Sequence, residues 1–421
     1  MDYSLLIMNK YIELVGCVVE GIRSENVYDN IKFSKLKIQS SRKVAEDALA
    51  LAFDNLNKDR KKLLDCMSSI IFNEIIFLNE TVERIDKDID ELKSVFELQT
   101  CTLTDIEVVD GEAHNCGRMI CILTFDIGDG KFKKIVYKPK PIERDFIING
   151  KNNSICDANG LQTLTMLVKD DYGYIEFVEH CKEFNEKNDK DTEDALLYKL
   201  AKLDVLFNKT CTGDMHKENI IVTNCNGALS FVAIDSEVFS YAQVIGYQVT
   251  QFNKYFNFQT TRCSEYMFSE KFKECNNDKS IYNSKLAEKE RFELLKAKIS
   301  EIEEKKDFKI EDSQMRRLLG AKNRIVPIGT QMLCDLKDRY LKDIDKLDEV
   351  VDECVRGLKF SLSEIMTSCF SKDQEKIIEK CIKYDFMSGR ECIPFFLYQY
   401  EKGMYYNSTR FENFSVIKNK L

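Results

Sequence analysis

The chain has 421 residues, of which 44% are hydrophobic and 32% charged, and its formal net charge at pH 7 is −9. This length and apolar fraction exclude a disordered chain and predict a globular protein with one large core or two to three packed lobes. The acidic balance argues against a protein that binds nucleic acid by neutralising phosphates, so we expect no nucleic-acid partner.

The 16 cysteines are scattered, and no two stand in a Cys-x-x-Cys spacing. The apolar run at 11–22 contains Glu13 and Glu20 and lacks the basic start of a signal peptide, and no window has the apolar length of a membrane helix. We therefore expect a cytoplasmic protein with no membrane span, and we interpret its cysteines as reduced thiols in preference to metal ligands.

Residues 1–100 are predicted to form a helical N-terminal region. Apolar residues recur at helical intervals over 63–93 with charged residues between them, and no glycine or proline interrupts 23–110. The region contains no chemical motif. Structural support is the favoured interpretation, and a leader-docking or regulatory role is the alternative.

The pattern changes to short strands at residue 103. Residues 103–109, 119–125 and 132–137 are strand-like, and Asp-Ile-Gly-Asp-Gly at 126–130 predicts a hairpin between the last two. Lys138 follows the third strand directly. The N-lobe of a protein kinase has the same order of elements: a strand, a glycine-containing turn, a second strand, a hairpin, and a third strand that ends in a lysine. In kinases that lysine contacts the phosphates of ATP. Lys138 is therefore a candidate ATP-binding residue.

The turn at 111–118 contains two glycines and several polar side chains, but it is not a Gly-x-Gly-x-x-Gly loop. Its place in the order predicts that Gly117 and Arg118 contact the phosphates of the cofactor. Glu112 and His114 could perform acid/base work there. The simpler alternative is a polar turn in which the histidine is a cap.

Residues 155–210 are predicted to return to helix, ending in an amphipathic helix at 196–207. An aromatic patch at 172–179 is a candidate hinge between lobes. Glu176 and Glu179 are candidate carboxylate partners for Lys138.

Three polar residues, Asp214, His216 and Asn219, stand just before an apolar run. A turn at 224–227 separates this run from a second one that ends at Asp235, and Glu237 follows. Protein kinases use an Asp to orient the attacking hydroxyl, an Asn five residues later on metal, and a second metal Asp beyond a hairpin. The spacing predicts Asp214 as a catalytic residue and Asn219 and Asp235 as Mg²⁺ ligands. Glu237 is either a further metal ligand or a carboxylate that supports the ligands.

Residues 316–331 form a basic cluster broken by Pro327 and Gly329. By pattern alone this segment is either a phosphate-holding element or the end of a surface helix. The charged stretch at 283–305 is predicted to be a long exposed helix, and the chain beyond 331 is predicted to be mostly helical.

These elements predict an α+β protein with a kinase-like bilobal core, in which a small antiparallel sheet lobe joins a helical lobe. We expect a helical N-terminal region at 1–100, an N-lobe at 101–180, and a C-lobe at 181–421 that includes helical elimination or activation elements.

The motifs together resemble the dehydratase domain of LanM-type (class II) lanthipeptide synthetases, over roughly residues 75–400. The family's Asp-x-His…Gly-Arg turn is similar to residues 112–118, and its Tyr-Lys-Pro-Arg stretch is similar to Tyr-Lys-Pro-Lys at 137–140. The family's late Asp-Ile-Pro-Tyr-Phe is similar to Cys-Ile-Pro-Phe-Phe at 392–396. The remaining matches are the family's Asp-x-His-x-x-Asn, its Ile-Asp-x-Glu and its Arg…Thr-Gln, which correspond to Asp214, His216 and Asn219, to Ile234, Asp235 and Glu237, and to Arg324, Thr330 and Gln331.

The resemblance implies a two-step dehydration of Ser or Thr in a precursor peptide. ATP with Mg²⁺ phosphorylates the hydroxyl, and a base then removes the α-proton so that phosphate leaves, giving dehydroalanine or dehydrobutyrine. It implies that Lys138 and the 214–237 set serve phosphorylation. It assigns elimination to His114 with Glu112 and to Arg324 with Thr330, the arginine stabilising the departing phosphate.

The chain departs from the family's pattern at three positions. Glu112 stands where the family has Asp, Ile328 where it usually has a second arginine, and Cys392 where it has Asp. The sequence also ends where the family's zinc cyclase begins, so we expect a stand-alone dehydratase with a precursor peptide as substrate and a separate cyclase or other modifying enzyme as partner. The alternatives are a kinase that stops at the phosphorylated peptide or protein and a catalytically dead scaffold.

Overall fold

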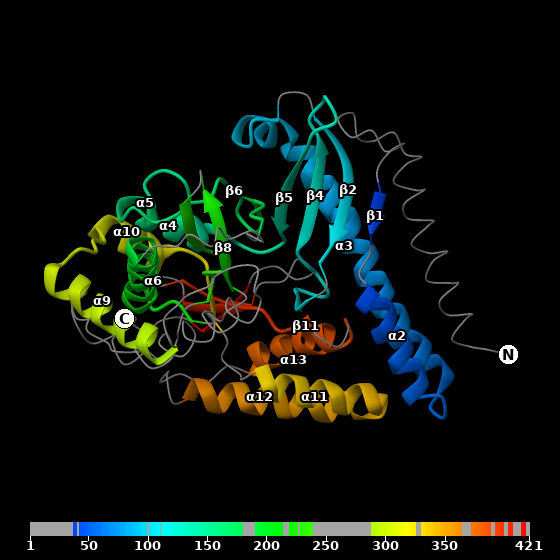
Figure 1. The fold of residues 1–421 in the computed structure, drawn as a ribbon. Helices are drawn as coiled ribbons and strands as arrows, with labels where there is room; N and C mark the ends of the chain where they lie inside the picture. Colours follow the sequence, from blue (N-terminus) through cyan, green and yellow to red (C-terminus); the bar gives the residue numbers. More distant parts are fainter. Residues whose placement is uncertain are drawn as a thin grey trace. The chain divides into compact units, whose positions relative to one another are not determined.

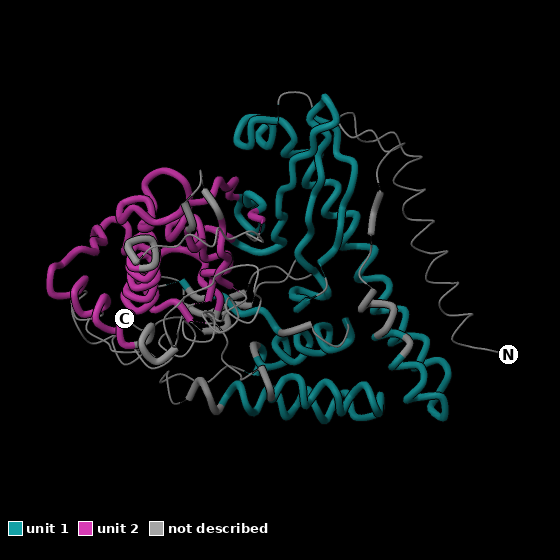
Figure 2. Tube along the Cα trace, in the orientation of Figure 1, with its two compact units in different colours: residues 1–141, 169–177, 326–421 teal, residues 142–168, 178–325 magenta. Residues whose placement is uncertain are grey.

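The chain folds as a mixed α+β structure, as predicted, with a small, mainly antiparallel sheet and several helices (Figure 1). The computed structural model describes residues 37–39, 42–98, 101–109, 111–179, 190–213, 219–225, 228–238, 288–325, 330–363, 372–388, 392–399, 403–406 and 414–417. The chain divides into two compact units (Figure 2). Unit 1 comprises Met1–Pro141, Lys169–Phe177 and Val326–Leu421, and unit 2 comprises Ile142–Val168 and Val178–Ile325. The functional division into 1–100, 101–180 and 181–421 stays a prediction.

Five strands of unit 1 pair in the order β1-β2-β4-β5-β7. The pairs β2–β4, β4–β5 and β5–β7 are antiparallel, and β1 is parallel to β2. The predicted strands and hairpin are confirmed, since Asp126 of β4 pairs with Phe132 of β5 across the 126–130 turn. The bounds are β1 (Lys37–Gln39), β2 (Thr102–Val108), β4 (Cys121–Asp126), β5 (Phe132–Lys138) and β7 (Gly173–Glu176).

The prediction of helix over 155–210 is wrong for its middle part. Within the described parts of this range, 155–179 and 190–210, α5 (Ile155–Ala158) and α6 (Lys190–Thr210) are helical, while β6 (Met166–Val168) and β7 are strands. The aromatic and β-branched residues around 172–178 fit a half-buried pleated surface better than a helix. In the β5–β7 register Lys138 lies opposite Gly173 and Glu176 lies opposite Ile135, so Glu176 is displaced from Lys138 along the strand.

The long helix α3 (Arg60–Val95) confirms the predicted helix at 63–93 and runs along β2, β4 and β5 (Figure 1). Asp59 caps its start by accepting a hydrogen bond from the backbone N–H of Lys62 at 2.9 Å. The helix buries an apolar stripe that includes Phe77, Val82 and Ile85. Polar residues of the same helix reach the sheet: Arg84 donates to the hydroxyl of Tyr137 at 2.8 Å.

The remaining helices in the described part of unit 1 are α2 (Arg42–Asp54), α11 (Thr330–Lys342), α12 (Leu347–Ser363) and α13 (Lys372–Phe386), with a short 3-10 turn at Ile344–Lys346. Asn55 ties α2 to this group, because its side chain donates to the carbonyl of Leu341 at 2.6 Å and accepts from the N–H of Ile344 at 2.9 Å. A fully buried amide with both ends bonded fixes this junction.

The C-terminal part is less helical than predicted. The strands β11 (Cys392–Ile393), β12 (Phe396–Gln399), β13 (Gly403–Tyr406) and β14 (Phe414–Ile417) follow α13. β12, β13 and β14 form an antiparallel meander, and β11 pairs in parallel with β3 (Ala113–His114). The sequence of β12 accounts for part of this outcome, because its aromatic residues Phe396 and Tyr398 alternate and aromatic residues favour sheets.

Unit 2 is built around α6, which packs against α9 (Glu288–Lys305) and the β8–β9 hairpin. The prediction of a wholly exposed helix at 283–305 is corrected, since Leu295, Ile299 and Ile302 of α9 are buried in the unit's core. Besides α5 and β6, the described elements of this unit include α4 (Glu143–Asn149), β8 (Ile220–Cys225), β9 (Ala228–Ala233), α10 (Asp312–Gly320) and β10 (Asn323–Ile325).

Several cysteines of the described core are buried thiols, among them Cys66, Cys121, Cys156 and Cys354. Burial raises the pKa of the Cys354 thiol to about 12, so it carries no nucleophilic thiolate at neutral pH. These residues act as small apolar side chains in the core.

Across the described ranges, none of the helices combines the length and the apolar character that a membrane crossing requires.

Candidate active site

The β8–β9 hairpin of unit 2 brings Asn219 and Asp235 to the same end of a two-stranded ribbon. Ile220 pairs with Ala233, and the backbone N–H of Ile234 donates to the carbonyl of Asn219 at 3.0 Å. Asn219 therefore precedes β8 at the place where the chain leaves β9 toward Asp235. Asn219 is buried and Asp235 is half-buried. The hairpin predicted from the 224–227 turn is confirmed, and it explains the closeness of two residues 16 positions apart in sequence.

The two residues before Asp214 are held by backbone hydrogen bonds to two other segments. The N–H of Thr212 donates to the carbonyl of Phe207 at 2.9 Å, and the N–H of Gly213 donates to the carbonyl of Val238 at 2.9 Å. The chain is thus fixed against the segment after β9 one residue before Asp214. Asp214 and His216 themselves lie outside the described residues.

A buried ion pair joins Glu237 to Arg324. Nη1 of Arg324 lies 2.7 Å from Oε1 of Glu237, and the two side chains are 7% and 2% exposed. Their backbones also pair, because the N–H of Arg324 donates to the carbonyl of Glu237 at 3.1 Å and Val238 bridges to Arg324 in parallel. The structure therefore brings together one residue predicted for metal binding and one predicted for elimination, which are 87 positions apart.

Sequence reasoning missed two buried residues of α4, Arg144 and Asp145. Arg144 donates four hydrogen bonds, to the carbonyls of Ser236 and Thr210, to the side-chain oxygen of Asn323 and to the hydroxyl of Thr212, at 2.8 to 2.9 Å. Asp145 accepts from the N–H of Ser236 at 2.7 Å. Burial lowers the pKa of Arg144 to about 10, which leaves it charged at neutral pH.

In unit 1 the predicted acid/base residues lie on a well-ordered turn. The backbone N–H and carbonyl of His114 bond to Arg118 at 2.9 and 2.7 Å, closing residues 114–118 into a tight loop. The ring of His114 is buried, packs on Phe395 with ring centroids 5.2 Å apart, and has Nε2 3.9 Å from Oε2 of Glu112. Glu112 and His114 are thus adjacent, as their predicted joint role requires.

Gly117 and Arg118 have structural partners within the same unit. Gly117 follows two other residues with positive φ, Asn115 and Cys116, and its own φ is +90°. The Nε of Arg118 donates to Oε2 of Glu80 on α3 at 2.8 Å, its Nη2 contacts the same oxygen, and its Nη1 contacts the carbonyl of Asn115. Whether these residues also contact a cofactor stays a prediction.

Lys138 is the last residue of β5, as predicted, and its side chain is buried. It faces a glycine, Gly173, in the neighbouring strand β7. Its neighbour Tyr137 points to the other side of the strand, toward Arg84 of α3. Alternation along a strand therefore directs Lys138 away from that helix.

Thr330 begins α11 and belongs to unit 1, whereas Arg324 belongs to unit 2. The candidate residues therefore fall into two groups, each described within its own unit. Glu112, His114, Gly117, Arg118, Lys138 and Thr330 belong to unit 1, and Asn219, Asp235, Glu237 and Arg324 to unit 2.

The donor set near the β8–β9 hairpin suits Mg²⁺ chemically. Asn219, Asp235 and Glu237 offer amide and carboxylate oxygens, which this ion prefers, and Mg²⁺ sites usually take few protein ligands and complete their shell with water and phosphate. No group of three or more His, Cys, Asp and Glu side chains arranged for a metal occurs among the residues with described positions, which omit Asp214 and His216.

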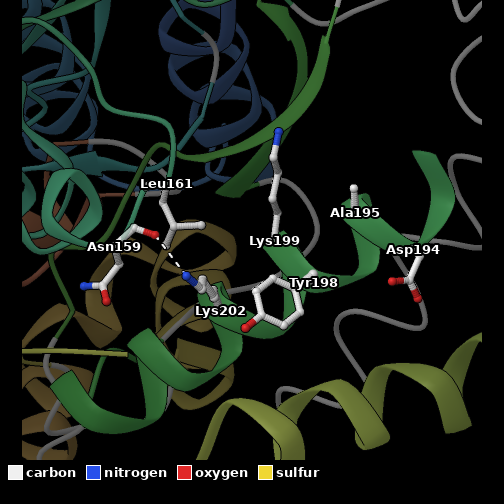
Figure 3. A pocket seen from close by; sticks show the side chains of 8 residues that line it. Asn159, Leu161, Asp194, Ala195, Tyr198, Lys199 and Lys202 are labelled. Atoms are coloured by element: carbon white, nitrogen blue, oxygen red, sulfur yellow. Dashed lines mark hydrogen bonds between the residues drawn. The ribbon is translucent and has the colours of Figure 1, made fainter. Parts of the chain in front are cut away.

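A separate hollow of about 420 Å³ lies in unit 2 beside α6 (Figure 3). The ammonium of Lys202 donates to the carbonyl of Asn159 at 3.3 Å and pairs with Asp307 at 3.2 Å, while Asp194 pairs with Lys298 at 2.6 Å. Asp194 and Lys202 of its lining are thus paired with charged residues that lie outside the lining. None of the predicted site residues lines it; its lining is Asn159, Gly160, Leu161, Asp194, Ala195, Tyr198, Lys199 and Lys202.

Comparison with known families gives one match, to the model described as "Domain of unknown function (DUF4135)", over residues 62–344. The matched stretch contains most of the candidate residues, from Glu112 to Thr330, and covers more than half of the chain. No curated protein matches the chain.

Proposed function

Because the chain belongs to the DUF4135 family, which is associated with lanthionine synthetase-like proteins, we propose that it is a kinase-like, LanM-like peptide dehydratase. In this proposal it phosphorylates Ser or Thr side chains of a precursor peptide and then eliminates phosphate to form dehydroalanine or dehydrobutyrine. Kinase-like lobes, the peptide substrate and the two-step chemistry are all part of the proposal.

The observation that carries the proposal is the buried ion pair between Glu237 and Arg324. Glu237 follows the Asp235 that the kinase pattern assigns to metal, and Arg324 is the residue assigned to departing phosphate. Enzymes that transfer phosphoryl groups also use an arginine to stabilise the charge of the transferring group. A buried arginine beside the metal carboxylates therefore fits both steps of the proposal, because the same position carries negative charge when phosphate is added and when it leaves.

In the phosphorylation step, Asp214 orients the hydroxyl of the substrate and accepts its proton, and His216 assists beside it. Asn219, Asp235 and Glu237 would hold Mg²⁺, and Lys138 would contact the phosphates. ATP, when bound, supplies the phosphoryl group. The chain's own contribution is positioning and charge, which is where catalysis of phosphoryl transfer chiefly arises.

In the elimination step, a base removes the α-proton of the phosphorylated residue and the C–O bond to phosphate breaks, so a carbon–carbon double bond forms and inorganic phosphate leaves. His114 with Glu112 is the candidate base, since the imidazole lies close to a carboxylate. Arg324 offers a fixed positive charge to the leaving phosphate, with Thr330 as a hydroxyl donor.

The test is intact-mass analysis of a precursor-type peptide encoded beside the gene, incubated with the protein, ATP and Mg²⁺. Loss of about 18 Da per site, the mass of water, is the expected result. A lasting gain of about 80 Da, the mass of a phosphoryl group, would replace the dehydratase proposal by a kinase that stops after the first step.

Two variants assign the steps. Asp214→Asn is expected to abolish both mass changes, whereas Arg324→Ala is expected to accumulate phosphorylated peptide. Arg316→Ala is the matched control, because Arg316 is an exposed arginine on α10 of the same unit. Rapid elimination by Arg324→Ala would refute the role given to that arginine.

A further inference from the structure

The strongest unassigned feature of unit 2 is the cluster formed by Arg144, Asp145, Thr210, Thr212, Ser236 and Asn323, here called the Arg144 cluster. Arg144 is fully buried, and its described hydrogen bonds go to uncharged oxygens. Burying a charged group costs free energy, and hydrogen bonds to its donors offset only part of that cost. The four hydrogen bonds of Arg144 therefore indicate a position at which the fold tolerates a buried charge.

Three of the four partners of Arg144 lie within two positions of a candidate catalytic or metal-binding residue. Thr212 comes two positions before Asp214, Ser236 stands between Asp235 and Glu237, and Asn323 immediately precedes Arg324. The planar guanidinium of Arg144 therefore links three segments that are far apart in sequence and fixes their positions relative to one another. A guanidinium presents its donors in a rigid fork, so it can set such a relation more accurately than a flexible ammonium.

The neighbouring residues of α4 reinforce this arrangement. Asp145 accepts from the N–H of Ser236, so the Ser236 peptide is held from both its donor and its acceptor side by two consecutive residues. At the other end of the helix, the side chain of Asn149 donates to the carbonyl of Ala233. The short segment that carries Asp235 is therefore fixed to α4 at three points.

We propose that Arg144 is a positioning residue that sets the relative placement of the metal carboxylates and the elimination arginine. The inference rests on the proposed function for its catalytic meaning, while the cluster itself is defined by the contacts above. Arg144 acts through Ser236, Thr212 and Asn323 and makes no contact with substrate in this account.

The cluster is tested first without any ligand, by hydrogen exchange of backbone amides in the full-length protein. Three amides report on the three segments: Gly213, which donates to Val238; Ser236, which donates to Asp145; and Arg324, which donates to Glu237. Arg144→Lys should speed exchange in the peptides that contain them by at least tenfold. The control Leu203→Ala removes apolar volume from the core of the same unit and should not do so selectively.

The second readout is the Mg²⁺ concentration that gives half-maximal binding of a non-hydrolysable ATP analogue. Removing a residue that orients metal ligands typically costs about 10- to 100-fold in metal affinity, and we expect Arg144→Lys to fall in this range. Leu203→Ala, compared at a temperature where both variants are equally folded, should retain the wild-type value. In turnover, Arg144→Lys should also raise the ratio of phosphorylated to dehydrated peptide.

Equal exchange and equal Mg²⁺ dependence in Arg144→Lys and Leu203→Ala would overturn the inference and leave Arg144 as an ordinary core residue. If Arg144→Lys does not fold, Thr212→Val removes one acceptor of the cluster with little change of volume and takes its place in the same comparison. If the wild-type protein binds no Mg²⁺–nucleotide and modifies no peptide, the proposed function fails. The hydrogen-exchange comparison between Arg144→Lys and Leu203→Ala then decides by itself whether the cluster positions the three segments.

Discussion

Breaking the ion pair between Glu237 and Arg324 should lower the unfolding free energy of unit 2 by much more than breaking an exposed ion pair would. Both side chains are more than nine-tenths buried, with N and O atoms 2.7 Å apart. Replacing Arg324 by Met removes a cationic partner from a buried carboxylate, which costs about 3–5 kcal/mol of unfolding free energy. Replacing both residues by Met removes both desolvation costs, so most of the loss should be regained despite the more drastic change.

The two units of this chain need not unfold together, so the assay must report on unit 2 alone. Urea titration with pulsed hydrogen exchange, read on peptides from β8 and β9, meets this need. With a denaturant slope of about 3 kcal/mol/M, the single variant should lower the unfolding midpoint of these peptides by about 1–2 M, and the double variant by less than half of that.

The reasoning is refuted by either of two results. A loss below about 1 kcal/mol for Arg324→Met would mean that the pair behaves like an exposed one. A double variant at least as unstable as the single would mean that packing around Glu237, and not charge compensation, determines the cost. Arg316→Ala controls for the general effect of removing an arginine from this unit.

Three further predictions concern other parts of the fold. Gly117→Ala should cost about 1–2 kcal/mol in thermal unfolding because φ is +90° there, whereas Gly111→Ala, with no such backbone and open space, should cost nothing measurable. Asp88→Asn should cost about 3 kcal/mol, since this buried carboxylate accepts from two tyrosine hydroxyls and pairs with a lysine. Hydrogen bonds from Tyr198 and a lysine hold the pKa of Asp307 below its ordinary value, so its contribution to stability is present above about pH 4 and lost on acidification; Asp307→Asn should show a smaller acid-induced decrease in melting temperature.

Local pattern was sufficient where a segment's structure depends on its own side chains. The β4–β5 hairpin was predicted correctly from the alternation at 119–125 and the glycines of the 126–130 turn. The position of Lys138 at the end of the third strand was also predicted correctly. The β8–β9 hairpin followed in the same way from the turn at 224–227.

Pattern failed where distant partners decide. β7 is only four residues long, and it becomes a strand because β5 pairs with it from 35 to 41 positions away. Arg144 stands in a short helix after two prolines, and nothing local marks it as buried, because its acceptors lie 66 to 179 positions away along the chain. Local propensity contains no information about such contacts.

The turn at 111–118 is held to α3 by Arg118, one of the residues predicted to contact phosphates. Arg118 contacts Glu80 through two nitrogens and the carbonyl of Asn115 through a third, so drawing its guanidinium toward a ligand would leave Glu80 with one cationic partner fewer in a part-buried site. The geometry therefore favours Arg118 as the residue that holds the turn to α3. The same turn holds His114, whose backbone is hydrogen-bonded to Arg118 and whose ring packs on Phe395. In the proposed reaction, the turn therefore holds the acid/base residue in a fixed position. A misplacement of about 1 Å at such a residue costs on the order of 100-fold in rate.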